Sequence, residues 1–254
     1  RVVRPEQLHR AYQRLPASLR AAASGGSRAV SSDALATRDR NLRALAARAQ
    51  LYAPSRWLAD AAARQGFARP EVLPHGVDAP QLPRGDGPFL FLGTIAPHKG
   101  PALVIEAHRR AGLSRPLSVY GPPGPDAAYN AAVPSLGPVA DPFPLLASAR
   151  ALVLGSTWPE NAPLVVLEAR AMGCPVVAPA IGGLPEIVTE GVDGWLYPAG
   201  DVDALAACLR RLERGPPLPV SRPPSFEDHA DRLVVSLGAW LSRSKKPRPP
   251  STAS

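Results

Sequence analysis

Residues 88–213 alternate between two hydrophobic periods. Short apolar runs bounded by Gly or Pro indicate buried strands, whereas longer stretches with apolar residues three or four positions apart indicate helices. Strands are predicted over residues 88–92, 116–120, 151–155 and 175–178, and helices over 100–111, 141–148, 163–172 and 201–213. Strands that alternate with helices are typical of an α/β fold with a doubly wound, Rossmann-like parallel sheet.

The pattern on either side of this region divides the chain further. Residues 1–30 mix Arg and Ala and contain a Gly-Gly break, and residues 79–87 form a Pro- and Gly-rich linker. Between these two segments we predict a helix over 33–47, a strand over 50–53, a helix capped by Ser55 and closed by Gly66, and a strand over 71–74. The expected parts are residues 1–78, a domain over 79–224, an amphipathic helix over 225–242 and a disordered basic tail over 243–254.

Length and charge limit the classes of function that this chain can have. The 254 residues suffice for one large or two small domains, and the net charge is +8. Residues 1–78 carry 13 Lys and Arg against six Asp and Glu, whereas residues 79–242 carry 12 against 15. The second part therefore lacks the basic footprint that nucleic acids select. The basic first part and the tail predict a peripheral contact with an anionic membrane surface.

Two further features bear on location. Cys174 and Cys208 lie in apolar contexts without metal-ligand spacing, which favours reduced thiols and a cytoplasmic protein. No apolar run reaches the length of a membrane span, so any membrane contact is expected at the inner face. The chain begins with Arg1 and not with Met, which predicts that the natural N-terminus lies further upstream.

The stretch from Trp158 to Gly194 carries the most specific chemistry. Glu160 and Glu168 stand in the spacing E-x7-E, with Pro163 between them at the expected first position of a helix capped by Asn161 or Ala162. The free amides at the start of that helix, those of Leu164 and Val165, together with the helix dipole, favour a phosphate or diphosphate.

The two carboxylates are placed on either side of this anion site. Glu160 precedes the helix, and Glu168 lies roughly 7 to 8 Å along the axis from the helix start, at about 1.5 Å per residue. Each carboxylate can accept two hydroxyl hydrogen bonds. This arrangement suits a ligand made of a sugar, a diphosphate and a ribose.

Four ordered motifs resemble the donor domain of the retaining glycosyltransferases of family 4, which have the two-domain GT-B fold. They are a Gly-x-x-x-x-x-Lys-Gly loop at Gly93–Gly100, E-x7-E at Glu160–Glu168, G-G-x-P-E at Gly182–Glu186 and G-x-x-G at Gly191–Gly194. The resemblance implies a GT-B-type donor domain over residues 79–224. It also implies that residues 1–78 are a partial, N-terminally truncated Rossmann-like domain of the acceptor side.

The resemblance implies transfer of a hexose from a nucleotide diphosphate sugar to an acceptor, with retention at the anomeric carbon and without a metal or other cofactor. Lys99 is the expected cation for the diphosphate, Glu160 would accept hydroxyls of the donor sugar, and Glu168 those of the ribose. Lys99 and Glu160 are the expected catalytic residues. Thr94 stands where relatives commonly have an arginine, and Glu186 is interpreted as a helix cap. The full set of expected donor-binding residues is Gly93, Thr94, Lys99, Gly121, Glu160, Asn161, Ala162, Leu164, Val165 and Glu168.

Several alternatives stay open at this point. The resemblance leaves UDP, GDP and ADP as alternatives for the donor nucleotide, and a glycan, a lipid or a small molecule of cell-envelope polysaccharide synthesis as alternatives for the acceptor. A catalytically silent module that only binds nucleotide sugars is a second hypothesis, and a GT-B nucleotide-sugar epimerase is a third. Because the acceptor-side domain is partial, we expect this chain alone to bind nucleotide without transferring sugar.

Overall fold

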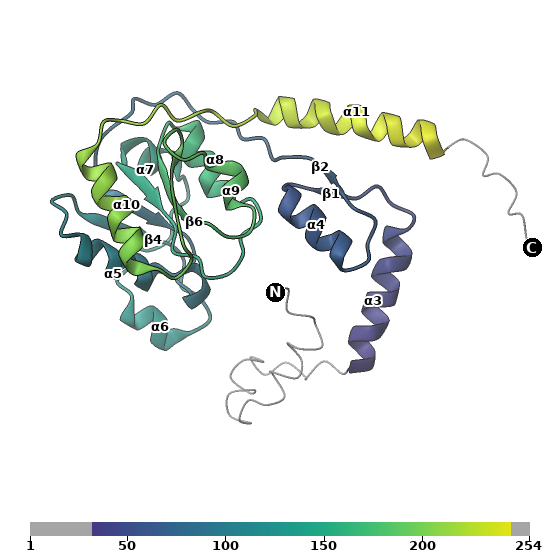
Figure 1. Cartoon of the computed structure of the whole chain (residues 1–254), viewed down its shortest axis with the longest axis horizontal. Coiled ribbons are helices and arrows are strands. Elements are labelled where there is room, and N and C mark those ends of the chain that lie inside the picture. Colours follow the sequence, from purple (N-terminus) through teal and green to yellow (C-terminus); the bar gives the residue numbers. More distant parts are fainter. Residues whose placement is uncertain (1–31, 245–254) are drawn as a thin grey trace, which may run out of the picture. The chain divides into compact units, whose positions relative to one another are not determined.

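Five parallel strands form the sheet on which the larger part of the chain is built (Figure 1). The computed structural model describes residues 32–244. The strands are β3 (Phe89–Leu92), β4 (Leu117–Tyr120), β5 (Ala151–Val153), β6 (Val176–Pro179) and β7 (Gly194–Tyr197). Their order across the sheet is β4-β3-β5-β6-β7. The predicted α/β class with a doubly wound parallel sheet is confirmed.

Helices cover both faces of this sheet (Figure 1). The longer ones are α5 (Pro101–Ala111), α8 (Leu164–Ala171) and α10 (Val202–Arg214), and the shorter ones are η1 (Pro97–Lys99), α6 (Ala127–Ala132), α7 (Phe143–Ser148) and α9 (Leu184–Ile187). Helices α5 and α10 pack on one face, whereas α7, α8 and α9 pack on the other.

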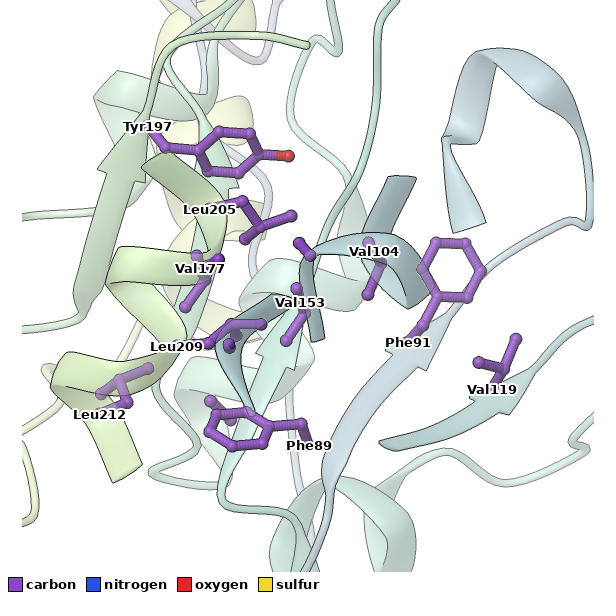
Figure 2. Close-up of a cluster of buried hydrophobic side chains, with 14 of the residues drawn as sticks. Phe89, Phe91, Val104, Val119, Val153, Val177, Tyr197, Leu205, Leu209 and Leu212 are labelled. Carbon is purple, nitrogen blue, oxygen red and sulfur yellow. The ribbon is translucent and has the colours of Figure 1, made fainter. Parts of the chain in front are cut away.

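Alternate residues of each strand supply the two halves of the core. Phe89 of β3 and Val153 of β5 point to the face that α5 and α10 cover, and Leu90 and Leu152, their chain neighbours, point to the opposite face. Figure 2 shows the cluster on the face that α5 and α10 cover, in which Leu209 of α10 packs against side chains of β3 and β5. Since both faces are covered, the strands read as nearly continuous apolar runs instead of alternating ones.

The chain divides into two compact units, Arg1–Ala49 and Gln50–Ser254. In the described part of the first unit lies the helix α3 (Ser32–Ala46), at the position predicted for it. The second unit begins with β1 (Tyr52–Ala53), α4 (Arg56–Arg64) and β2 (Glu71–Val72), and it includes the final helix α11 (Phe226–Ser244). The predicted domain boundary at residue 78 stays a prediction.

Strands β1 and β2 pair in parallel, with α4 connecting them. They form a single βαβ unit, which agrees with a partial Rossmann-like domain at this end of the second unit. Ser55 caps α4 as predicted, because its hydroxyl accepts a hydrogen bond from the Leu58 amide at 3.1 Å. The predicted break at residues 25–26 and most of the predicted tail lie outside the described residues.

Three details differ from the sequence-based expectations. Helix α8 begins at Leu164 and Pro163 is its N-cap, so the expectation that Pro163 is the first helical residue, capped by Asn161 or Ala162, was wrong by one position. Proline keeps a suitable φ of −63° there, but its ψ of 126° is extended. Strand β7 and the short helices η1, α6 and α9 were not predicted, and α11 continues two residues beyond the predicted end at 242.

Candidate functional site

A pocket of about 340 Å³ opens at the carboxyl ends of β3, β4 and β5. Strand β3 is the first strand of the sheet along the chain and lies between β4 and β5. The chain therefore passes from β3 to β4 on one side, and from β4 it crosses back to β5 on the other side of β3. Ligands of open parallel α/β sheets bind at such a switch point. Its lining comprises Phe91, Leu92, Gly93, Thr94, Lys99, Gly121, Pro122, Val139, Pro142, Leu154, Ser156, Glu160, Pro163, Val165 and Glu168.

Two glycines bring the polar residues of this pocket together. Gly100 follows η1 with a left-handed φ of 64°, and a Cβ there would lie 1.9 Å from the carbonyl oxygen of Gly155. A Cβ on Gly155 would in turn lie 2.2 Å from the carbonyl oxygen of Gly100. Only residues without side chains allow this approach. It places Lys99, just before one glycine, close to Ser156, just after the other.

Lys99 and Glu160 form an ion pair at the pocket wall. The Lys99 Nζ lies 2.7 Å from the Glu160 Oε1, and the Ser156 hydroxyl donates to the same oxygen at 2.9 Å. The side chains of Lys99 and Glu160 are 32% and 13% exposed. The carboxylate is therefore held in one orientation, while the lysine keeps donors free for a further anion.

Helix α8 points its N-terminus to the same pocket through Pro163 and Val165. The amides of Leu164 and Val165 open the helix, where no carbonyl of the preceding turn can accept from them. Glu168 lies one turn further along and also lines the pocket. Burial raises the pKa of the Glu168 carboxyl. A lysine, a helix N-terminus and two carboxylates thus surround one cavity.

Seven of the ten expected donor-binding residues line this pocket: Gly93, Thr94, Lys99, Gly121, Glu160, Val165 and Glu168. The side chains of the other three, Asn161, Ala162 and Leu164, are not in the lining. Asn161 instead accepts a hydrogen bond from Ser55, and the Leu164 side chain is exposed, which leaves its amide as the group facing the helix end. The ligand roles of all ten stay predictions.

Ser156 and the apolar wall of the pocket were not predicted from the sequence. Ser156 is 2% exposed and directly follows the glycine after β5, where the strand-end rule could have found it. Val139 and Pro142 come from the irregular segment after α6, and no sequence signal marks them. Glu186 is a helix cap as predicted, but it caps α4 and not its own helix.

Comparison with known proteins decides the family. The family profile described as Glycosyl transferases group 1 matches residues 87–214, half of the chain. The chain belongs to the group 1 glycosyltransferases. The matched segment contains the whole five-stranded sheet and every polar residue of the pocket.

Relatives of this glycosyltransferase chain agree with the family. It is 36% identical over 149 residues to a D-inositol 3-phosphate glycosyltransferase of Mycobacterium avium, covering 53% of this chain and 35% of that protein. It is 48% identical over 56 residues to the amylovoran biosynthesis glycosyltransferase AmsK of Erwinia amylovora, covering 22% and 14%. The chain thus spans about a third or less of the length of these relatives.

Solved structures of glycosyltransferases confirm the GT-B-type fold. Anabaena HepE in complex with UDP and glucose superposes with a TM-score of 0.61 at 24% identity, covering 82% of this chain and 66% of the HepE chain. At this level of identity the likeness concerns the fold alone. The structural likeness covers 82% of this chain, whereas the family match ends at residue 214 and covers half of the chain.

Within residues 32–244 of the glycosyltransferase chain, no group of three or more His, Cys, Asp or Glu side chains has the arrangement of a metal site. None of the described helices combines the length and the apolar character needed to cross a bilayer. Among the residues that line the pocket, the positively charged one is Lys99.

We predict that Glu168→Gln makes the protein more stable at neutral pH. Burial raises the pKa of this carboxyl, so its charge opposes folding at neutral pH. The variant should melt at a higher temperature at pH 7, and the gain should vanish as the pH falls below about 4, the unfolded pKa, because the carboxyl then becomes protonated in both states. Glu227→Gln, on the exposed face of α11, is the matched control. An unchanged melting temperature at pH 7 would contradict this prediction.

Proposed function

We propose that this chain carries the donor site of a hexosyltransferase that uses a nucleotide diphosphate sugar, retains the anomeric configuration and needs no metal. One observation carries the proposal: Lys99, the N-terminus of α8, Glu160 and Glu168 surround a single pocket at the switch point of a parallel sheet. A diphosphate suits the cation and the helix N-terminus, and the hydroxyls of a sugar and a ribose suit the two carboxylates.

Each part of the donor has a matching wall. The diphosphate would lie between Lys99 and the first amides of α8, where both the charge and the dipole favour it. The ribose would donate hydroxyl hydrogen bonds to Glu168, and the sugar would do so to Glu160, whose orientation Ser156 and Lys99 fix. The apolar wall at Val139 and Pro142 suits a flat nucleobase.

The same groups would assist the reaction. As the bond to the sugar breaks, negative charge develops on the leaving diphosphate, and Lys99 and the α8 amides would stabilise that charge. This preorganised stabilisation supports a reaction without a metal. Fold neighbours solved in complex with UDP and glucose and with UDP-glucose favour a UDP-sugar as the first donor to test. We further propose that the product is a polysaccharide of the cell envelope, made at the cytoplasmic side. The relative named for amylovoran biosynthesis supports a biosynthetic role.

Calorimetry with UDP-, GDP- and ADP-sugars tests the donor site. We expect binding of at least one of these series, unchanged by EDTA, and competition by the corresponding nucleoside diphosphate. Radiolabelled transfer to a mixed acceptor panel, with the product anomer assigned by NMR, then separates a transferase from a module that only binds the donor. Absence of binding to all three series would overturn the proposal.

Glu160→Gln should reduce discrimination among sugars more than it reduces nucleotide affinity. The carboxylate accepts from Lys99 and Ser156 at one oxygen, which leaves the other oxygen for sugar hydroxyls. Affinities for UDP-glucose, UDP-galactose and UDP should therefore converge in the variant. Glu106→Gln, which removes an exposed carboxylate from α5, is the control. A uniform loss for all three ligands would show that Glu160 does not contact the sugar.

A further inference from the structure

The G-G-x-P-E turn at Gly182–Glu186 contacts the backbone of Glu160, the residue proposed to bind the donor sugar. The Gly183 amide donates to the Glu160 carbonyl oxygen at 2.7 Å. A Cβ on Gly182 would lie 2.0 Å from that oxygen, and a Cβ on Gly183 would lie 1.9 Å from the Asn161 carbonyl oxygen. The two glycines are therefore required for the close contact between this turn and the Glu160–Asn161 peptide.

The other end of the same turn caps α4. The Glu186 carboxylate accepts hydrogen bonds from the Arg56 amide at 2.8 Å and the Trp57 amide at 2.7 Å, which are the first two amides of that helix. The Glu186 side chain is only 19% exposed, so these charge-assisted bonds are largely shielded from water. A carboxylate more than a hundred residues away in sequence thus satisfies the helix start, a role that local residues usually fill.

Ser55 closes the connection back to the site. Its hydroxyl donates to the Asn161 Oδ1 at 2.6 Å while accepting from the Leu58 amide, which uses both its donor and an acceptor site. Ser55 is 2% exposed, and its Cβ lies 3.1 Å from the position of a Cβ on Gly183. Asn161 directly follows Glu160, so a shift of the α4 N-terminus would move the loop that carries Glu160.

We propose that the N-terminus of α4 is a positioning element for Glu160, acting through Ser55 and Asn161 on one side and through Glu186 and Gly183 on the other. This inference rests on the proposed role of Glu160 at the donor sugar. It makes sugar recognition depend on how α4 is docked. Among the described residues, no hydrogen bond or ion pair joins α4 to the nucleotide half of the site, which is built on Lys99 and α8. Ser55 and Glu186 are positioning residues and touch no substrate.

The affinities of UDP and UDP-glucose, measured by calorimetry on the full chain, test the proposal. Ser55→Ala and Glu186→Gln should each weaken UDP-glucose by about 5- to 20-fold and leave UDP within about twofold, since a positioning loss of this size corresponds to about 1 to 2 kcal/mol. Ser55→Thr, which keeps the hydroxyl, should restore the wild-type ratio.

Asp201→Ala is the matched control, because Asp201 caps α10 through the Asp203 and Ala204 amides and lies outside the site. This variant loses a helix cap as Ser55→Ala does, yet it should leave both affinities unchanged. If Ser55→Ala weakens UDP and UDP-glucose equally, in step with its melting temperature, α4 has only a structural role and the proposal is wrong.

Amide hydrogen exchange provides a readout without ligand. Ser55→Ala should accelerate exchange in the peptides that cover residues 158–164 and 181–187, and Asp201→Ala should not. Unchanged exchange in both peptides would overturn the coupling even if nucleotide binding is normal. If the wild-type chain binds no nucleotide sugar but Ser55→Ala accelerates this exchange, the proposed function fails and the coupling stands.

Discussion

Asp193→Ala is expected to lower the free energy of unfolding by about 3 to 5 kcal/mol, because it leaves a buried charge without its partner. Asp193 is 1% exposed and accepts from the Ser221 amide at 2.8 Å, the Ser221 hydroxyl at 2.6 Å and the Thr189 amide at 3.1 Å. The Arg170 Nε lies 3.5 Å from the same carboxylate, and among the described residues this atom has no hydrogen-bond partner. The variant would leave Arg170 of α8 without its carboxylate partner. It would also remove the hydrogen bonds that hold Ser221, in the segment that follows α10.

The pH dependence of this effect has a definite sign. Desolvation alone would raise the pKa of Asp193, but the hydrogen bonds from Ser221 and Thr189 and the charge of Arg170 together lower it. Because the folded pKa lies below the unfolded value of about 3.9, the carboxylate stabilises the fold above about pH 4, and this contribution is lost as the pH falls through the folded pKa. Wild type and Asp193→Asn should therefore converge in acid.

Urea unfolding followed by circular dichroism measures both effects. Asp203→Ala is the control, since Asp203 also pairs with an arginine, but its side chain is 78% exposed and its loss should matter little. Similar destabilisation by the two variants would show that burial does not distinguish Asp193.

Lys99→Ala is expected to weaken a bound nucleoside diphosphate by about 10- to 150-fold, the equivalent of about 1.5 to 3 kcal/mol for a charge-assisted contact. The affinity for the free nucleoside should change by less than about twofold, because the nucleoside offers no anion to the lysine. Calorimetry with UDP and uridine gives both values. Arg109→Ala, which removes an exposed positive charge from α5, controls for the change in net charge.

The double variant Lys99→Ala/Glu160→Gln separates two roles of the lysine. In the structure Lys99 neutralises Glu160, so Lys99→Ala also exposes the pocket to an unpaired carboxylate. If the lysine binds the diphosphate directly, the double variant stays weak. If its role is only to neutralise Glu160, the double variant recovers wild-type affinity for UDP, and the assignment of Lys99 to the diphosphate is wrong.

The sequence alone was sufficient for the features that depend on local pattern. Apolar runs such as Phe89–Leu92 can satisfy their backbone and bury both faces only as inner strands, so their positions were predicted to within about one or two residues. Because parallel strands end at one edge, Lys99, Gly121 and Glu160 could be assigned to one site before any coordinates. The helix start at α8 shifted by one residue, since proline fits both N-cap and first-turn positions.

Only the tertiary structure decided which polar groups pair with one another. Lys99 and Glu160 are 61 residues apart, Ser55 and Asn161 are 106 apart, and Glu186 reaches amides about 130 residues before it. No periodicity encodes such partners, because they depend on which loops the sheet order and the glycine contacts bring together. The sequence therefore determined four of the five strands of the sheet, the edge of the sheet at which the pocket lies, and the family. The packing of the chain decided how Glu160 is oriented and what holds it there.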